Sequence, residues 1–524
     1  MFDEKRIWIG SAGDKKSYLF SKMANRHGLI AGASGTGKTV TLKVLIEAFS
    51  ERGVPVFVAD VKGDIAGLAK PGNQEKMGQR ALTKFNDGNF TVDGFPICVW
   101  DVFGEKGLPL RTTIEDMGPV LLSRLMELSD IQSDVLNIVF HIAEDNKVEI
   151  NTIEDLRKLI TYINKAKDDY VAKYGNMSTQ SLGAIQRSLL ALQDLGGDKF
   201  FGLPGLDISD WFDNDGLVDV NEKKFGLIHV LHSVELAHNP TLYGTFLLWM
   251  LTKLFEKLPE EGDLEKPKFV FFFDEAHMLF TDAPKALVTK VEQVVKLIRS
   301  KGVGIYFISQ SPSDIPDKVL SQLSNRIQHG LRAYTPAEQK AVKAAAQAFR
   351  ANPGFKTEEA ILDLGIGEAV VSCLDEEGRP SIVERAFIVP PRSRLGPLSD
   401  EEYDEVMEAS YLDYLKEKCD PSEMTRKEKE AIRKNEDRLD DLLESVEEEE
   451  PPAKKTSTSS TRTTSKTTSK STASKAKTSS SRSSSTKTAA KKTAGRAAGR
   501  AVGNAASVIG REAGKGLISL FKKK

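Results

Sequence analysis

The sequence predicts an α/β protein built on a mainly parallel sheet with helices on both faces. From residue 25 to about residue 389, short apolar runs rich in β-branched residues alternate with longer stretches of helical periodicity. The apolar runs are nearly continuous, which is typical of strands that are covered on both faces. The expected strands span residues 27–33, 54–60, 95–99, 226–231, 269–274, 304–309, 326–331, 369–374 and 382–388.

A helical insertion is expected to interrupt this α/β core, which we place at residues 1–395. Over residues 112–194 the spacing of apolar residues is helical and strand-like runs are few. Leu121, Leu122 and Leu125 belong to its apolar stripe. The insertion either packs against the core as a structural element or forms a lid or substrate-contacting subdomain.

The rest of the chain is predicted to be a charged helical and disordered C-terminal extension. Residues 396–450 form an acidic helical segment, expected as one charged helix over about 400–447 that ends at a glutamate run and two prolines. Residues 451–495 are rich in Ser, Thr and Lys, which is typical of a disordered linker. Residues 496–524 regain apolar residues and form a basic amphipathic tail.

Charge is distributed very unevenly along the 524 residues, although the whole chain has a net charge of only -2. Residues 451–524 carry a net charge of +17 and residues 396–450 a net charge of −13, so the core is only mildly acidic. The basic part could attract phosphate groups in a salt-dependent way or fold back on the acidic segment. The tail itself could stay solvated, dock on an oligomer or partner, or contact a membrane or nucleic acid.

Three cysteines, Cys98, Cys373 and Cys419, lie far apart with no CxxC pair, so neither a disulfide framework nor a zinc site is indicated. The longest apolar run, residues 246–255, is shorter than the roughly 20 residues that span a bilayer. The first residues lack the charged and then apolar pattern of a signal peptide. We therefore expect a cytoplasmic protein without a transmembrane segment.

A phosphate-binding loop is predicted between the first core strand and the helix that follows it. The pattern G-x-x-x-x-G-K-[ST] is formed by Gly32, Ala33, Ser34, Gly35, Thr36, Gly37, Lys38 and Thr39. Its glycines let main-chain N–H groups and the helix N-terminus face an anion. Lys38 is expected to reach the β- and γ-phosphates of ATP, and the Thr39 hydroxyl to bind Mg²⁺. The alternative is an ordinary glycine-rich turn before a helix.

A second acidic centre follows the apolar strand at residues 269–274. Asp274 is expected to hold the Mg²⁺ shell, and Glu275 to orient and polarise the attacking water. The two acids could instead cap the start of a helix. Gln310 ends another buried strand, where it could touch the γ-phosphate or the water, or be merely a turn residue. Asp60 ends the strand at 54–60, and its role is less defined.

These segments resemble the HerA/FtsK superfamily of DNA-pumping ATPases, and more narrowly the bacterial HerA-like proteins of the DUF853 (YjgR-type) family. The resemblance rests on the phosphate-binding loop and on residues 25–30, 57–64, 274–277, 299–304 and 324–329, with Arg299 eleven residues before Gln310. It covers about residues 5–395. It implies a RecA-like P-loop NTPase fold, with Gln310 as a polar sensor, usually in a hexameric ring.

The resemblance also implies that an arginine reaches the nucleotide of a neighbouring subunit. Arg299, Arg326 and Arg332 are the candidates, and each could equally be a surface or ion-pairing residue. Archaeal HerA proteins carry an amino-terminal β-barrel, whereas only about 25 residues precede the first core strand here. That difference puts a nuclease partner in doubt.

Two functions remain open at the level of the sequence. The first is an ATP-hydrolysing, Mg²⁺-dependent motor, a DNA translocase or helicase-like protein that acts as a homo-oligomeric ring. The second is an ATP-dependent switch or assembly protein without a nucleic-acid substrate, which the mild acidity of the core favours slightly.

Overall fold

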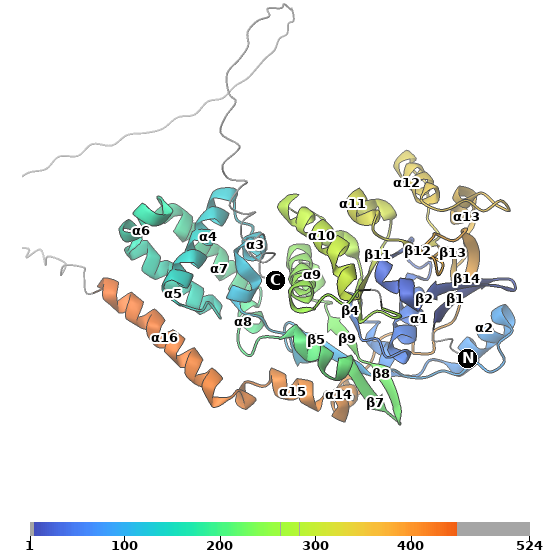
Figure 1. The fold of residues 1–524 in the computed structure, drawn as a ribbon, viewed down its shortest axis with the longest axis horizontal. Helices are drawn as coiled ribbons and strands as arrows, with labels where there is room; N and C mark the ends of the chain where they lie inside the picture. Colours follow the sequence, from blue (N-terminus) through green and yellow to red (C-terminus); the bar gives the residue numbers. More distant parts are fainter. Residues whose placement is uncertain (1–4, 263, 282, 284, 448–524) are drawn as a thin grey trace, which may run out of the picture. The chain divides into compact units, whose positions relative to one another are not determined.

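The computed structural model describes residues 5–447, apart from residues 263, 282 and 284. Within these residues, twelve strands form one sheet in the order β2-β1-β14-β13-β12-β3-β11-β10-β4-β9-β5-β6 (Figure 1). Parallel pairing runs from β12 to β6, through β12 (Asn325–His329), β3 (Gly28–Ala31), β11 (Val303–Ser309), β10 (Phe269–Phe273), β4 (Val56–Asp60), β9 (Ile228–His232), β5 (Ile97–Asp101) and β6 (Leu108–Pro109). All nine predicted strands are present, so the prediction of a mainly parallel α/β sheet is confirmed.

The other edge of the sheet is antiparallel and includes a hairpin that the sequence analysis did not predict. Its strands are β13 (Glu368–Ser372), β14 (Glu384–Ile388), β1 (Arg6–Ala12) and β2 (Lys15–Phe20). Ile7 and Ile9 on β1 are fully buried, and Gly13 forms the turn with φ 60°. The residues before the first parallel strand therefore extend the main sheet.

Alternation of side chains along the strands divides the core into two halves, one on each face of the sheet. On β10, Val270 and Phe272 join the half that packs against α1 (Lys38–Glu51). Phe269, Phe271 and Phe273 join the half that packs against α9 (Pro240–Lys257) and α10 (Lys285–Leu297). Burial on both faces explains why these strands are apolar throughout.

Several shorter helices also belong to this part of the chain. They are α2 (Gln74–Phe85), α11 (Asp317–Leu320), α12 (Pro336–Gln347) and α13 (Thr357–Asp363). A two-stranded hairpin, β7 (Leu217–Val220) and β8 (Lys223–Gly226), forms a second sheet that is not hydrogen-bonded to the main sheet. No helix of the described part of the chain is long and apolar enough to cross a membrane.

The segment between β6 and β7 is helical, and its helices lie beyond the parallel end of the sheet (Figure 1). They are α3 (Ile114–Leu125), α4 (Asp130–Asp145), α5 (Ile153–Lys165), α6 (Lys167–Tyr174), α7 (Thr179–Asp194) and α8 (Gly197–Phe200). Their apolar stripes, which include Leu122, Leu136 and Leu159, belong to the same core as α9.

The prediction of one helix over about 400–447 is wrong. The structure contains α14 (Asp400–Met407), α15 (Asp413–Cys419) and α16 (Arg426–Glu447). Pro421 lies between the last two, and proline disrupts a helix interior because it lacks an N–H group. The linker at 451–495 and the tail at 496–524 lie outside the described residues.

Candidate nucleotide-binding site

The phosphate-binding loop connects the carboxyl end of β3 to the start of α1, as the pattern requires. Gly37 has φ 114°, a conformation that residues with a side chain rarely adopt. A Cβ atom on Gly32 would lie 2.5 Å from the Cβ atom of His329, so only glycine fits there. The main chain of the loop can therefore approach a phosphate closely at the N-terminus of α1.

Lys38 begins α1 and is buried beside the loop. Its Nζ donates hydrogen bonds to the carbonyl oxygens of Gly32, at 2.6 Å, and Ala33, at 3.3 Å. Burial lowers the pKa of Lys38, although Glu275 and Asp274 oppose that shift. Thr39 follows it in the first turn and is partly exposed. Both residues thus lie at the helix N-terminus, where the sequence places them.

The acidic centre lies at the end of β10, two strands from β3, which carries the loop, with β11 between them. Strand β11 pairs in parallel with β3 on one side and β10 on the other, so all three carboxyl ends meet at one edge. Burial raises the pKa of Asp274 to about 6, with Lys62 opposing the shift. Tyr243 on α9 donates to the main-chain carbonyl of Asp274 at 2.8 Å and fixes the end of the strand.

Glu275 has a left-handed backbone, with φ 46° and ψ 47°, which costs roughly 1–2 kcal/mol for a residue with a side chain. Its side chain is 8% exposed, and Lys62 Nζ donates to its Oε1 at 3.1 Å. The other oxygen, Oε2, is buried and has no hydrogen-bond partner among the described residues. His277 Nδ1 lies 3.4 Å from Oε2 without hydrogen-bond geometry.

Helix capping does not explain the two acids. Glu275 precedes a short 3-10 helix, η5 (Ala276–Leu279), and its side chain makes no capping hydrogen bond there. Asp274 Oδ1 accepts only from the main-chain N–H of Glu275 in this segment, at 2.9 Å. Both carboxylates instead lie close enough to Lys38 of the phosphate-binding loop to oppose the lowering of its pKa.

Asp60, whose role the sequence left open, organises the loop after β4. Its two carboxylate oxygens accept from the main-chain N–H groups of Gly63, Asp64, Ile65 and Ala66, at 2.7, 3.1, 2.8 and 3.2 Å. This loop contains Lys62. Asp60 thus holds in place the segment from which Lys62 reaches Glu275.

Gln310 directly follows β11, at the edge between the loop and the acidic centre. The main-chain carbonyl of the preceding residue, Ser309, accepts from Gly32 N at 3.2 Å, and the Gln310 side chain is exposed. Its position agrees with a sensor of the γ-phosphate, and that role stays a prediction.

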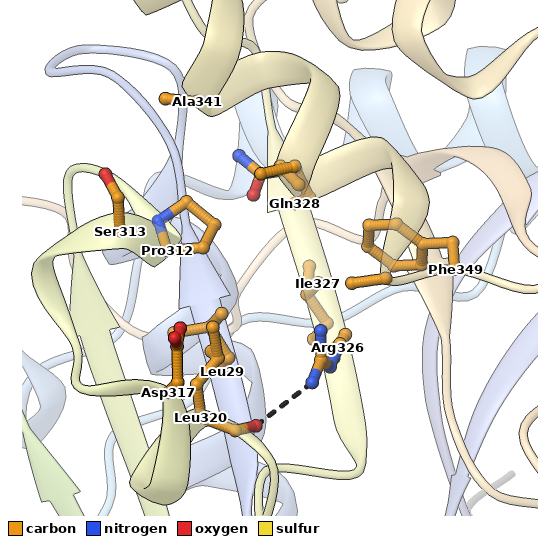
Figure 2. A pocket seen from close by; sticks show the side chains of 13 residues that line it. Leu29, Pro312, Ser313, Asp317, Leu320, Arg326, Ile327, Gln328, Ala341 and Phe349 are labelled. Atoms are coloured by element: carbon orange, nitrogen blue, oxygen red, sulfur yellow. Dashed lines mark hydrogen bonds between the residues drawn. The ribbon is translucent and has the colours of Figure 1, made fainter. Parts of the chain in front are cut away.

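Two of the three candidate arginines, Arg326 and Arg299, lie at the amino ends of strands, and the third, Arg332, follows a carboxyl end. Arg326, at the start of β12, donates to the carbonyl oxygen of Leu320 at 3.0 Å (Figure 2) and to that of Leu323, also at 3.0 Å. It lines a cavity of about 130 Å³ under α12 that includes no residue of the phosphate-binding loop. Arg299 precedes the amino end of β11, which is the edge opposite the loop.

Arg332 is exposed and follows the carboxyl end of β12. That end lies beside the phosphate-binding loop, because Ala33 N donates to the carbonyl oxygen of Gly330 at 2.9 Å. Of the three arginines, Arg332 is therefore the one at the nucleotide edge. A role in trans for any of them stays a prediction.

The sequence analysis did not assign roles to three residues of this site: Lys62, Tyr243 and His329. Lys62 stands in a segment that the resemblance singled out, but its contact with Glu275 joins residues 213 positions apart. Tyr243 lies within an apolar stretch, His329 ends the segment 324–329 that the resemblance also singled out, and both are fully buried. Only the fold brings these side chains to the site.

A P-loop at the end of a parallel strand, with two acids two strands away, defines a nucleotide-binding protein of the P-loop class. Within that class, the chain belongs to the family described as helicase HerA-like C-terminal, whose model matches residues 6–520. A probable helicase of Methanocaldococcus jannaschii, MJECL08, is 29% identical over 167 residues, which is 30% of either chain. The present chain thus spans less than a third of that curated relative's length.

Solved structures with a similar arrangement include the plasmid coupling protein TrwB in complex with ADP and Mg²⁺. It is 13% identical, with a TM-score of 0.48, over 76% of this chain and 94% of TrwB. VirB4 of Thermoanaerobacter pseudethanolicus is 15% identical, with a TM-score of 0.48, over 74% of this chain and 97% of VirB4.

Proposed function

We propose that this protein hydrolyses ATP and uses the energy to move DNA, as a homo-oligomeric ring. The observation that supports hydrolysis is the meeting of the phosphate-binding loop and Asp274-Glu275 at one edge of the sheet. The observation that supports a DNA substrate is membership of the helicase HerA-like family. A hexameric ring and a cytoplasmic location stay predictions.

The residues present fit the binding of Mg²⁺ with ATP. Mg²⁺ in such sites is held by one or two protein oxygens together with phosphate oxygens and water. Thr39 and Asp274 supply a hydroxyl and a buried carboxylate, and among the described residues no ion pair involves Asp274. Bound Mg²⁺ would supply charge neutralisation at the β- and γ-phosphates.

In the proposed reaction, the main-chain N–H groups of the loop and Lys38 bind the phosphates. A water oxygen attacks the γ-phosphorus and the bond to the β–γ bridging oxygen breaks, which yields ADP and inorganic phosphate. Glu275 accepts the proton of that water through Oε2, the buried oxygen without a partner. Gln310 is placed to contact the γ-phosphate or the water.

The test of hydrolysis is phosphate release by wild type, Lys38→Ala and Glu275→Gln, together with nucleotide affinity. Glu275→Gln should bind ATP as wild type does and hydrolyse it about 10²–10⁴ times more slowly. Lys38→Ala should weaken binding as well, because it removes a phosphate ligand. Equal hydrolysis by all three proteins would show that this site is not the ATPase site.

A second function, an ATP-dependent switch or assembly protein, is favoured by the charge of the core. Residues 1–395 carry a net charge of −6, which gives no general attraction to nucleic acid. In this case ATP would change the oligomeric state, measured by light scattering, and DNA would leave the hydrolysis rate unchanged.

A further inference from the structure

The side chain of Glu275 makes a hydrogen bond through only one of its two oxygens, although His277 Nδ1 lies 3.4 Å from the other. Lys62 Nζ donates to Oε1 at 3.1 Å, while Oε2 is buried without a hydrogen-bond partner among the described residues. An unpartnered buried acceptor costs free energy comparable to a lost hydrogen bond, so such a group usually serves a function. Oε2 is thus the oxygen available to a donor that enters the site.

The main chain of the loop that carries Lys62 is held in place by hydrogen bonds. Lys62 lies on the loop after β4, the strand that pairs with β10, and Asp60 holds that loop through four main-chain hydrogen bonds. Burial by itself lowers the pKa of Lys62, but Asp274 and Glu275 raise it overall above its ordinary value. The side chain is therefore a charged ammonium group throughout the neutral pH range.

We propose that Lys62 is a positioning residue for ATP hydrolysis, which anchors Oε1 of Glu275 so that Oε2 faces the attacking water. This inference rests on the proposed ATPase function. The hydrogen bond from Lys62 keeps the other carboxylate oxygen of Glu275 in one orientation. The 3-10 helix that follows Glu275 does not hold this side chain, because the side chain makes no capping hydrogen bond there. Without the ammonium group, the carboxylate would rotate among several rotamers.

The proposal predicts an effect on the rate of hydrolysis rather than on nucleotide binding. Lys62→Met should lower kcat by about 10- to 100-fold, the cost of misplacing a reacting group by about an ångström. The affinity for a fluorescent ATP analogue should change by less than about 2-fold, because Lys62 contacts Glu275 and not the phosphate-binding loop. Lys62→Arg, which keeps the charge and donors, should restore part of kcat.

The decisive experiment combines Lys62→Met with Glu275→Gln. If Lys62 acts only through Glu275, adding Lys62→Met to Glu275→Gln should lower the residual rate no further. The matched control is Lys257→Met, since Lys257 is 48% exposed and pairs with Asp207 at 3.2 Å, while Lys62 is 51% exposed. That control should keep wild-type kcat.

Three results would overturn the inference while leaving the ATPase function intact. They are an unchanged or increased kcat in Lys62→Met, an equal loss in the Glu275→Gln background, or a matching loss of nucleotide affinity. The last result would show that Lys62 binds phosphate directly. A wild-type protein that binds ATP but does not hydrolyse it would overturn both this inference and the proposed function.

Discussion

His329, the last residue of β12, accepts a hydrogen bond from the hydroxyl of Thr41 on α1, with 2.8 Å between Nε2 and Oγ1. On its other side, Nδ1 lies 2.9 Å from the carbonyl oxygen of Glu368, which can only accept, so Nδ1 carries the proton. The neutral imidazole thereby joins the phosphate-binding helix to β12 and β13. Gly32 packs directly on this side chain.

This linkage predicts a pH-dependent contribution to stability. Burial lowers the pKa of His329 from 6.5 to about 4, so between these values the unfolded chain binds a proton here and the folded chain does not. The contribution of His329 is therefore complete above pH 6.5 and is lost as the pH falls towards 4. The free energy of unfolding by urea, measured for wild type and His329→Gln, should differ most at pH 7.5.

The difference should shrink by at most roughly 1.4 kcal/mol for each pH unit between 6.5 and 4.5. Glutamine keeps a donor and an acceptor but does not titrate, which makes it the matched substitution. A difference that stays constant over this pH range would show that the neutral form of His329 is not what the fold requires.

Asp60 and Asp101, which end β4 and β5, should contribute similarly to stability but differently to the hydrolysis rate. Asp60 and Asp101 are both buried, and both accept from main-chain N–H groups of the loop that follows. In either Asp→Asn variant the side-chain NH₂ cannot accept, so buried N–H groups lose partners at about 1–3 kcal/mol each. Both variants should lower the free energy of unfolding.

Only Asp60→Asn should also lower the hydrolysis rate at temperatures where both variants are folded, because its loop carries Lys62. Asp101→Asn is the control, since its loop, which includes Phe103, lies beyond β9 from that segment. Equal hydrolysis rates for the two variants would show that the loop after Asp60 does not contribute to catalysis.

Removal of Arg326 and removal of Arg332 should affect the protein differently. Arg326→Ala removes the side-chain donor to the carbonyl oxygens of Leu320 and Leu323, of which Leu320 keeps a bond from Leu323 N at 3.2 Å, so it should lower the thermal unfolding midpoint. Arg332→Ala removes an exposed side chain at the nucleotide edge and should leave the midpoint unchanged. If Arg332 acts in trans, its removal should slow hydrolysis by about 10³–10⁵.

A mixing experiment tests the trans role of Arg332. Arg332→Ala and Glu275→Gln subunits, each inactive alone, should regain activity together if they assemble, because some interfaces then contain both intact residues. Absence of recovery in mixed oligomers that light scattering shows to form would contradict a role in trans.

Asn435 attaches α16 to the helical insertion through hydrogen bonds to the main chain of Glu149. It is 4% exposed, and its side-chain amide bonds both the N–H and the carbonyl of Glu149, each at 2.8 Å. Asn435→Ala should cost about 1–3 kcal/mol and increase amide hydrogen exchange in α16 and α5. Unchanged exchange would mean that α16 is held chiefly by its apolar contacts, such as Leu439.

The sequence predicts the parallel strands well because burial on both faces makes each one an apolar run, as in Phe269–Phe273. The hairpin β1–β2 was missed because its signal is short: Ile7 and Ile9 are buried, but only Arg6 beside them is exposed, since Trp8 is half-buried and Gly10 is buried. The phosphate-binding loop and Asp274-Glu275 are local patterns, and the structure places them at one edge. Contacts such as Lys62 to Glu275 depend on strand order, which no local pattern contains.

The most direct test of the account is the steady-state ATPase rate with and without double- and single-stranded DNA, at low and physiological salt, beside Glu275→Gln. The account predicts stimulation by DNA that persists at physiological salt and disappears in Glu275→Gln. Stimulation seen only at low salt would indicate non-specific phosphate attraction. A rate that Glu275→Gln abolishes but that DNA leaves unchanged would contradict the DNA motor and favour the ATP-dependent switch.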